Sequence, residues 1–301
     1  MGNPLFLFQF IKTLEDERLL VFNFGLLKWK WDESIIESET ASTDNVVYLL
    51  QRKMKKCSQE SQMFLQCAAC LGASFTLETI NMIWQHQQRE INADSLSTRH
   101  STEELIMEMV EENYLEVEAH KDDKCRWVHD SVQEVAMSLI KEEDHDSFRR
   151  SIGEIWYQEL GEENLEPSLF EVTNLLNAIR TGVTNIDFAR LNLKAAEKAR
   201  DVAAFDRSIH YASSGISMLP SNKWDSCPEL TVKLYSLAAE AESFLGHHAK
   251  MESYCREVLS QESISILEKK DVYLTKLNSL TYAEMRFEDA IGLFLTILAD
   301  L

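Results

Sequence analysis

The chain is 301 residues long, with 45% hydrophobic and 27% charged residues and a formal net charge of −20 at pH 7. This length and composition are typical of a soluble globular protein with room for two domains that have cores of their own. The acidic balance argues against nucleic acid and anionic membrane surfaces as partners, because phosphate recognition needs clustered Lys and Arg. The 9 glycines and 4 prolines favour long helices over a strand-and-turn architecture.

The cysteines and the apolar runs indicate in which cellular compartment the protein is expected. Six cysteines are too few for a disulfide scaffold. Cys67 and Cys70 form a Cys-x-x-Cys pair within an apolar helical run, without a second pair or a histidine pair, so we expect buried helical cysteines and no metal site. No apolar run reaches the roughly 18 residues of a membrane span, and the start lacks the features of a signal peptide. We therefore expect a reducing, cytoplasmic compartment and no membrane partner.

The first 56 residues contain a helix, a hairpin and a second helix. Asn3 can cap the opening helix, and Pro4 suits the first helical position because no backbone N–H is needed there. Gly25 joins the two strands of the hairpin, and Thr43-Asp44-Asn45 caps the second helix. The predicted elements are a helix to about residue 17, strands at 19–24 and 28–31, and a helix from 46 to 54.

Residues 57–142 follow the order of a winged helix, which is three helices and then a two-stranded wing. Ser58 begins the first helix and Gly72 ends it in the usual C-terminal position. Ser101 and Glu104 form a capping box for the third helix. The second helix is predicted at 76–84, a polar loop at 85–101, and the wing strands at 114–118 and 125–128.

The third of these helices argues against DNA binding, although winged helices often bind DNA. The helix spans residues 101–113 and would have to enter the groove, yet it carries no Lys or Arg. Placing its carboxylates against phosphates is prohibitive. We therefore expect the winged helix to dock within its own protein. The carboxylates belong to Glu103, Glu104, Glu108, Glu111 and Glu112.

The wing ends at His129, and an amphipathic helix starts at once. Asp130 is predicted as the N-cap of this helix, and Gln133 is predicted at its third position, where it would complete a capping box. Nothing local explains a histidine directly before the cap. His129 is therefore the first candidate for a functional residue.

Residues 143–301 are predicted as helix after helix with a weak internal repeat. Small residues recur at the spacing of tetratricopeptide helix pairs, which lets two helices approach closely. On one of these helices, Asn192, Lys194 and Lys198 are candidates for lining a peptide groove. The stack reaches Leu301 on an apolar face without a polar capping helix, so we expect the chain to be cut there. The repeated positions are Ala196, Ser208, Ala212, Gly215 and Pro220, then Ala239, Gly246, Met251, Cys255 and Val258, then Asn278, Met285, Ala290, Phe294 and Ile297.

Two motifs resemble those of the signal-transduction ATPases, the STAND branch of the AAA+ superfamily. Gly2-Asn3-Pro4-Leu5-Phe6-Leu7 resembles their GxP motif at the lid, and Val128-His129-Asp130-Ser131-Val132 resembles their Met-His-Asp motif. Four further segments are similar to one subfamily, the predicted ATPase region of large kinases. These kinases carry a Ser/Thr-kinase-like domain upstream and often GAF and histidine-kinase domains downstream. The segments are Trp29-Lys30-Trp31-Asp32, Thr43-Asp44-Asn45-Val46-Val47, Cys67-Ala68-Ala69-Cys70-Leu71-Gly72 and residues 169–177.

The resemblance implies a fold and a mechanism. The fold would be mainly α: the end of an ATPase lid at 1–56, a winged helix with a small β-hairpin wing at 57–142, and a tetratricopeptide-like α-solenoid at 143–301. In relatives, the proline of GxP packs near the adenine and the histidine reaches the β-phosphate of bound ADP. Nucleotide-sensing roles would then fall to Pro4 and His129. The intact protein would bind ATP or ADP with Mg²⁺, and its partners would be the upstream nucleotide-binding and kinase domains.

The chain departs from this family in lacking a GxxxxGK[ST] loop and a strand that ends in two acidic residues. Without the phosphate cradle we expect no catalytic residue, no cofactor and no enzymatic activity of this chain alone. The leading interpretation is a regulatory fragment that couples nucleotide state to a helical sensor or scaffold in a signalling kinase. The alternative is a free-standing adaptor whose helical repeats bind a protein or peptide.

Overall fold

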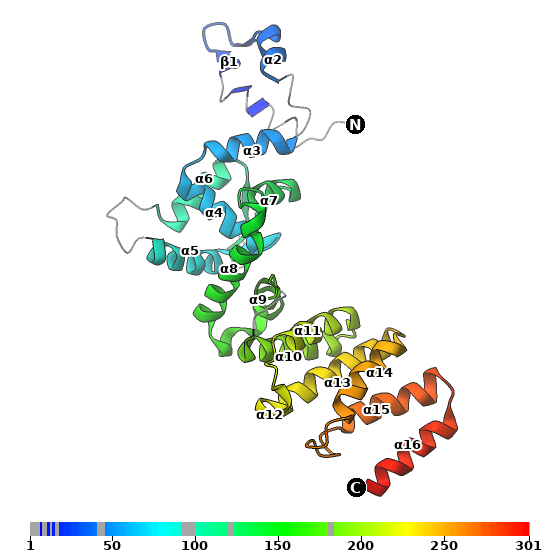
Figure 1. The fold of residues 1–301 in the computed structure, drawn as a ribbon. Helices are drawn as coiled ribbons and strands as arrows, with labels where there is room; N and C mark the ends of the chain where they lie inside the picture. The colour runs from blue at the N-terminus through cyan, green and yellow to red at the C-terminus, as the bar shows by residue number, and fades with distance from the viewer. Residues whose placement is uncertain are drawn as a thin grey trace. The chain divides into compact units, whose positions relative to one another are not determined.

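The computed structural model describes residues 7, 11–12, 14–15, 18–40, 46–91, 100–118, 123–179 and 184–300. The chain divides into two compact units, Met1–Glu162 and Glu163–Leu301. As the sequence predicted, the described part is mainly helical with small antiparallel sheets (Figure 1). Within it, no helix combines the length and apolar character needed to cross a membrane.

The first unit combines helices with two small sheets. Its elements are β1 (Leu20–Asn23), β2 (Lys28–Trp31), α2 (Glu33–Thr40), α3 (Val46–Lys56), α4 (Gln59–Cys70), β3 (Ser74–Thr76), α5 (Leu77–Ile91), α6 (Thr102–Glu111), β4 (Leu115–Glu118), β5 (Lys124–Trp127), α7 (Asp130–Met137), the short helix η1 (Glu142–Asp144) and α8 (His145–Leu160). The predicted hairpin is confirmed: β1 and β2 pair antiparallel, with Leu20 opposite Trp31. Gly25 lies in the turn between them. Phe22 and Trp29 meet across the strands, with ring centroids 5.2 Å apart.

The second sheet has three strands in the order β3-β5-β4. The sequence predicted β4 and β5, and both are confirmed as an antiparallel pair. It missed β3, in which Phe75 lies opposite Cys125. A strand of three residues is too short to show a period-2 pattern, and its pairing is instead held by distant contacts. One of these is the bond that the indole Nε1 of Trp127 donates to the carbonyl of Gly72, at 3.1 Å.

The helix α5 corrects the predicted loop at 85–101, because it continues to Ile91. Its last turns are polar and so resembled a loop, but they are held by neighbouring helices. Gln87 is buried, and Nδ1 of His86 lies 2.8 Å from a carboxylate oxygen of Glu159 on α8. The predicted capping box of Ser101 and Glu104 at the start of α6 is confirmed, with both of its hydrogen bonds present.

The core of the first unit lies between α4, α5, α6 and α7. Phe64 on α4 meets Trp84 on α5 edge to face, with centroids 5.4 Å apart. Cys67 and Cys70 both lie buried on α4 as free thiols. Burial raises the pKa of the Cys70 thiol to about 12. In this environment the two thiols act as small apolar core residues. Among the described residues, no group of three or more His, Cys, Asp and Glu could hold a metal ion.

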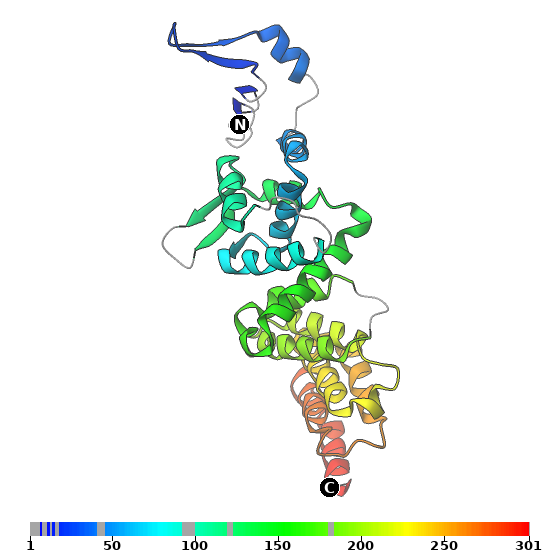
Figure 2. The ribbon, with the colours of Figure 1, turned by 90° about the vertical axis from the view of Figure 1, so that its left-hand side faces the viewer.

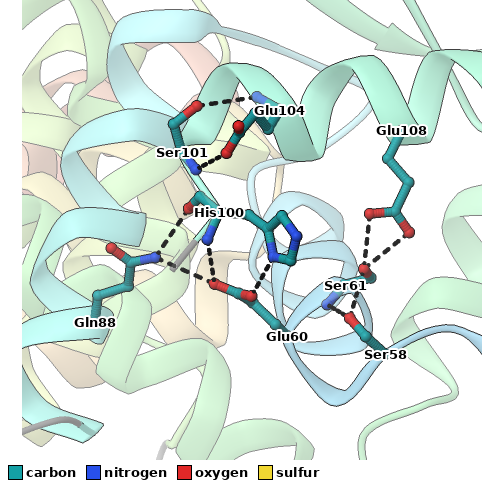
Figure 3. Close-up of polar contacts among 8 residues, drawn as sticks. All are labelled: Ser58, Glu60, Ser61, Gln88, His100, Ser101, Glu104 and Glu108. Carbon is teal, nitrogen blue, oxygen red and sulfur yellow. Dashed lines mark hydrogen bonds and ion pairs between the residues drawn. The ribbon is translucent and has the colours of Figure 1, made fainter. Parts of the chain in front are cut away.

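A polar cluster joins α6 and the residues just before it to the start of α4 (Figure 3). Nδ1 of His100 lies 2.7 Å from a carboxylate oxygen of Glu60. The hydroxyl of Ser61 donates to the carboxylate of Glu108 at 2.9 Å. The hydrogen bond to Glu60, together with its negative charge, raises the pKa of His100 above its ordinary value. The cluster thus positions α6 against α4 through charge-assisted contacts.

Replacing Glu60 by Gln should lower the pKa of His100 toward 6.5, because its main hydrogen-bond and charge partner is lost. A pKa raised in the folded state means that the contact stabilises the fold below the unfolded pKa, and that this contribution is lost as the pH rises through the folded pKa. NMR titration of the imidazole protons measures the shift. Glu103→Gln on α6 is the control and should leave the pKa of His100 nearly unchanged, because Glu103 is not among the groups that shift it. An unchanged pKa in Glu60→Gln would contradict the assignment.

The second unit is a succession of helices (Figures 1 and 2). Its elements are η3 (Glu166–Ser168), α9 (Leu169–Leu176), α10 (Ile186–Asp201), α11 (Phe205–Ser217), α12 (Lys223–Ser226), α13 (Pro228–Phe244), α14 (His248–Leu259), α15 (Lys270–Asn278), the π-helical turn η4 (Ser279–Ala283) and α16 (Phe287–Asp300); η2 (Glu162–Asn164) lies at the boundary between the units. Helix α10 packs on α11, α11 on α13, and α13 on α14. Helix α8 packs on α5 and so belongs to the first unit.

Small residues set the distances between helices of the second unit. The hydroxyl of Ser208 on α11 donates to the carbonyl of Ala196 on α10 at 2.9 Å, which only a close approach of the two backbones permits. At Gly215, an added Cβ would lie 2.8 Å from Cδ2 of Leu234 and 3.1 Å from Cβ of Asn192. Ser208 and Gly215, two positions in the first copy of the predicted repeat, therefore lie at helix crossings.

Gly215→Val should lower the free energy of unfolding by about 2 kcal/mol, because the added carbons have no room between Leu234 and Asn192. Gly292 on α16 is the matched control, since nothing lies within 4 Å of an added Cβ there. Gly292→Val should change stability by no more than about 0.5 kcal/mol. Urea unfolding followed by circular dichroism compares the two. Equal effects at both positions would contradict the crowding at Gly215.

Candidate functional site

The helix after the wing is capped by His129, and the predicted cap at Asp130 is wrong. His129 has extended backbone angles, with φ −159° and ψ 150°, and its Nδ1 accepts a hydrogen bond from the backbone N–H of Ser131 at 3.1 Å. An N-cap residue needs this non-helical backbone, and Asp130 is already the first helical residue. Gln133 does not form a capping box either, because its side-chain amide donates to the carbonyl of Ala69 at 3.0 Å.

This cap fixes the chemistry that His129 can offer. A nitrogen that accepts a hydrogen bond carries no proton, so Nδ1 is unprotonated and the neutral ring bears its proton on Nε2. The side chain is exposed. His129 therefore presents one N–H donor that is fixed in orientation by the cap on its other nitrogen. Pro4, the second predicted nucleotide-sensing residue, lies outside the described residues.

The structure does not bring the three predicted groove residues into one open groove. Asn192 is fully buried and exchanges two hydrogen bonds with Asn177, at 2.8 and 2.9 Å. It is a core residue, so its placement in a peptide groove is wrong. Lys198 donates to the carbonyl of Glu166 at 2.9 Å and forms an ion pair with the carboxylate of the same residue. Lys194 is exposed on α10.

A groove of about 700 Å³ lies elsewhere on the second unit, between α10, α13, α15 and η4. Charged side chains from α10 and α13 line one part of it, among them Arg200 and Glu240. Leu274 and Tyr282 supply apolar surface from α15 and η4. Sequence reasoning missed this groove, because its residues come from three separate helices. The repeat spacing was the one available signal, since it aligns α10, α13 and α15 as equivalent helices.

Burial and nearby charges shift the pKa of one carboxyl group in the groove, that of Glu240. Burial is the largest cause that raises the pKa of Glu240, the negative charges of Asp271 and Asp201 add to it, and Arg200 opposes it. The guanidinium of Arg200 lies 3.9 Å from the Glu240 carboxylate. Perturbed carboxyls in a concave surface are candidates for functional groups. The arrangement suits binding, because it combines apolar surface, hydrogen-bonding groups and a partly buried acid.

The chain is thus a mainly helical protein with an exposed histidine cap in one unit and a groove in the other. No family model matches it, and no solved structure matches it. It is similar to the hybrid signal transduction histidine kinase G of Dictyostelium discoideum, with 21% identity over an alignment that covers 99% of this chain. The chain spans 10% of the length of that kinase.

Asn192→Ala should lower the free energy of unfolding by about 2 kcal/mol, because the buried amide of Asn177 loses both of its partner's hydrogen bonds. Lys194→Ala, two residues away on the exposed side of α10, should stay within about 0.5 kcal/mol of the wild type. Chemical unfolding in urea measures both. An effect of Asn192→Ala no larger than that of Lys194→Ala would contradict a structural role for the asparagine pair.

Proposed function

We propose that this chain is a regulatory, non-catalytic segment of a multidomain signalling kinase. The observation that carries the proposal is the similarity to a signal transduction histidine kinase, which extends over 99% of this chain and only 10% of that protein. A segment of this length within a much larger kinase suits a module that controls other domains. Its partners are then the nucleotide-binding and kinase domains of the same protein.

The order of elements supports a finer assignment of the two units. In the first unit, α4, α5 and α6 precede the β4–β5 hairpin and α7, which is the order of a winged helix. In the second unit, α10 with α11 and α13 with α14 form successive packed pairs, as in tetratricopeptide-like repeats. On this proposal the first unit belongs to a STAND-type ATPase and the second is its sensor or scaffold.

His129 is the proposed latch between the nucleotide and the first unit. Its cap leaves an Nε2–H donor exposed at the junction of β5 and α7, and such a donor suits a phosphate oxygen of ADP. Pro4 would pack near the adenine. ATP or ADP with Mg²⁺ is then the ligand of the intact protein, and its phosphate cradle comes from the upstream domain. Exchange of the nucleotide changes the partner of His129 and shifts the protein between closed and open states.

The latch can be separated from the cap by two substitutions in the intact kinase. Asn is a favoured N-cap residue, so His129→Asn should keep α7 stable while removing the imidazole donor. His129→Ala removes both functions and should also cost about 1 kcal/mol of stability. Both variants should release ADP faster and raise kinase output, because losing the latch shifts the population to the open state.

Stopped-flow ADP dissociation, kinase activity and thermal unfolding measure these effects together. Unchanged ADP dissociation in both variants would refute the latch. A change in His129→Ala alone would reduce His129 to a structural cap. Sequencing the transcript upstream of the Met1 codon tests the wider proposal, because an in-frame P-loop followed by an acidic strand is expected there.

A free-standing adaptor is the second candidate function, and the groove of the second unit favours it. An adaptor needs only a surface that binds a protein segment, without a nucleotide-binding domain. A stop codon closely upstream of Met1 in the transcript would move this function to first place.

A further inference from the structure

The groove on the second unit holds more acidic than basic groups. Its charged lining comprises the carboxylates of Glu197, Glu240 and Asp271 and the cations of Arg200 and Lys233. This balance alone indicates no ligand, because acidic side chains are common on a chain with a net charge of −20. What matters is where the two cations have their partners.

Both cations have their nearest partners outside the groove lining. Lys233 donates to Glu229, one turn earlier on α13, at 2.8 Å. Arg200 donates two hydrogen bonds to Asp201, at 2.9 and 3.2 Å. Neither Glu229 nor Asp201 lines the groove. The positive charges are thus largely neutralised from outside, and the groove itself keeps its negative character.

Within the part of the chain that the structure describes, the carboxylates of the groove have no cation within hydrogen-bond range. Arg200 approaches Glu240 only to 3.9 Å, beyond hydrogen-bond range. Among the described residues, neither Glu197 nor Asp271 forms an ion pair, although the charge of Glu197 acts on Arg200 and Lys233 from a longer distance. Burial disfavours the charged form of Glu240 and raises its pKa. A cation brought into the groove would recover electrostatic free energy that the protein does not recover by itself.

A buried hydroxyl provides a second, independent observation. Ser236 lines the groove from α13 and is only 7% exposed, yet its Oγ has no hydrogen-bond partner among the described residues. Buried polar atoms are nearly always paired, so an orphan hydroxyl in a groove wall calls for an explanation. The Oγ is itself covered in this structure, so a ligand with hydrogen-bonding groups, such as a peptide backbone, would supply the missing partner once the Ser236 side chain turns toward the groove.

Large apolar side chains complete the groove. Phe244, Leu274 and Tyr282 line it and are 65%, 55% and 76% exposed. Phe244 is held in place by stacking on Phe205, with ring centroids 4.2 Å apart. Exposed apolar groups gathered beside polar ones are typical of protein interaction sites. The surface therefore offers an apolar contact next to its carboxylates.

We propose that this groove binds a protein segment in which Lys or Arg stands beside a large apolar residue. The carboxylates of Glu240 and Asp271 receive the cation, Leu274 and Tyr282 receive the apolar side chain, and Ser236 bonds to the backbone of the segment. The proposal rests on the proposed function only in treating the second unit as a protein-binding module. It gives the partner a charge opposite to the one that the predicted groove lysines, Lys194 and Lys198, would select.

Fluorescence anisotropy of labelled peptides on the full chain tests the proposal. One short peptide carries two lysines flanking a leucine and a phenylalanine in a Gly-Ser background, and its matched partner carries glutamates in place of the lysines. The lysine peptide should bind, and the glutamate peptide should bind at least tenfold more weakly. Affinity for the lysine peptide should fall with added salt, because part of the attraction is screened. Equal binding of the two peptides, or no binding of either, would overturn the proposal.

Substitutions in the groove test whether the lysine peptide binds there. Glu240→Gln with Asp271→Asn should weaken binding of the lysine peptide about tenfold. Glu103→Gln with Glu111→Gln removes the same two charges from α6 in the first unit and should leave binding unchanged. Ser236→Ala should weaken binding about threefold without loss of stability, since its hydroxyl has no partner to lose.

Equal losses in the two double variants would show attraction to the overall negative charge and would overturn the groove assignment. Concentration-dependent self-association that the lysine peptide does not disrupt would likewise contradict it, because a second copy would then cover the groove. These outcomes are separate from the latch, since a groove that fails to bind leaves the effects of His129→Asn on ADP release unaltered. Conversely, failure of the latch leaves peptide binding unaltered.

Discussion

The hydrogen bond from the backbone of Ser131 to Nδ1 of His129 determines how the first unit passes from its sheet into α7. β5 is the central strand of the sheet, and the backbone N–H of Val128, the residue after it, donates to the carbonyl of Tyr114 at 3.1 Å. His129 comes next and satisfies one of the orphan N–H groups of α7. It does so with an extended backbone and with Nδ1 as the acceptor. Its tautomer and its exposed N–H are therefore consequences of the fold.

The second unit depends on a different constraint, the room available between helices. Gly215 and the bond from Ser208 to Ala196 allow α10, α11 and α13 to pack with little space between them. The buried pair of Asn177 and Asn192 adds a polar contact that only one register of α9 against α10 can satisfy. With these crossings fixed, the side chains of α10, α13 and α15 that face away from the crossings are left to form the groove.

Local rules account for what the sequence could predict. The capping box of Ser101 and Glu104 involves residues three apart, and the β1–β2 hairpin closes through a short turn. In contrast, β3 pairs with a strand about 50 residues later, and no local pattern signals that partner. The cap at His129 was missed because Asp is a favoured cap, while the choice between two adjacent residues depends on backbone angles that the sequence does not display.

The candidate site shows the same contrast between features that follow local rules and features that depend on distant contacts. Asn192 and Lys194 are two residues apart, and such neighbours point to different sides of a helix. Grouping them as one surface was therefore wrong on helical geometry, and the structure places one in the core and the other in solvent. The groove could not be predicted residue by residue, because Arg200, Glu240 and Leu274 meet only when three helices are aligned.

The two candidate sites differ in how much affinity each could supply. One exposed hydrogen bond contributes about 1 kcal/mol, whereas micromolar affinity needs about 8 kcal/mol. His129 could therefore report on a nucleotide that other groups hold, but could not bind one by itself. The acidic surface of the chain adds repulsion toward phosphates and makes that dependence stronger. The groove combines carboxylates, an orphan hydroxyl and apolar area in one place. It has the means to bind a cationic segment directly, and the same net charge that disfavours nucleotide attracts that segment.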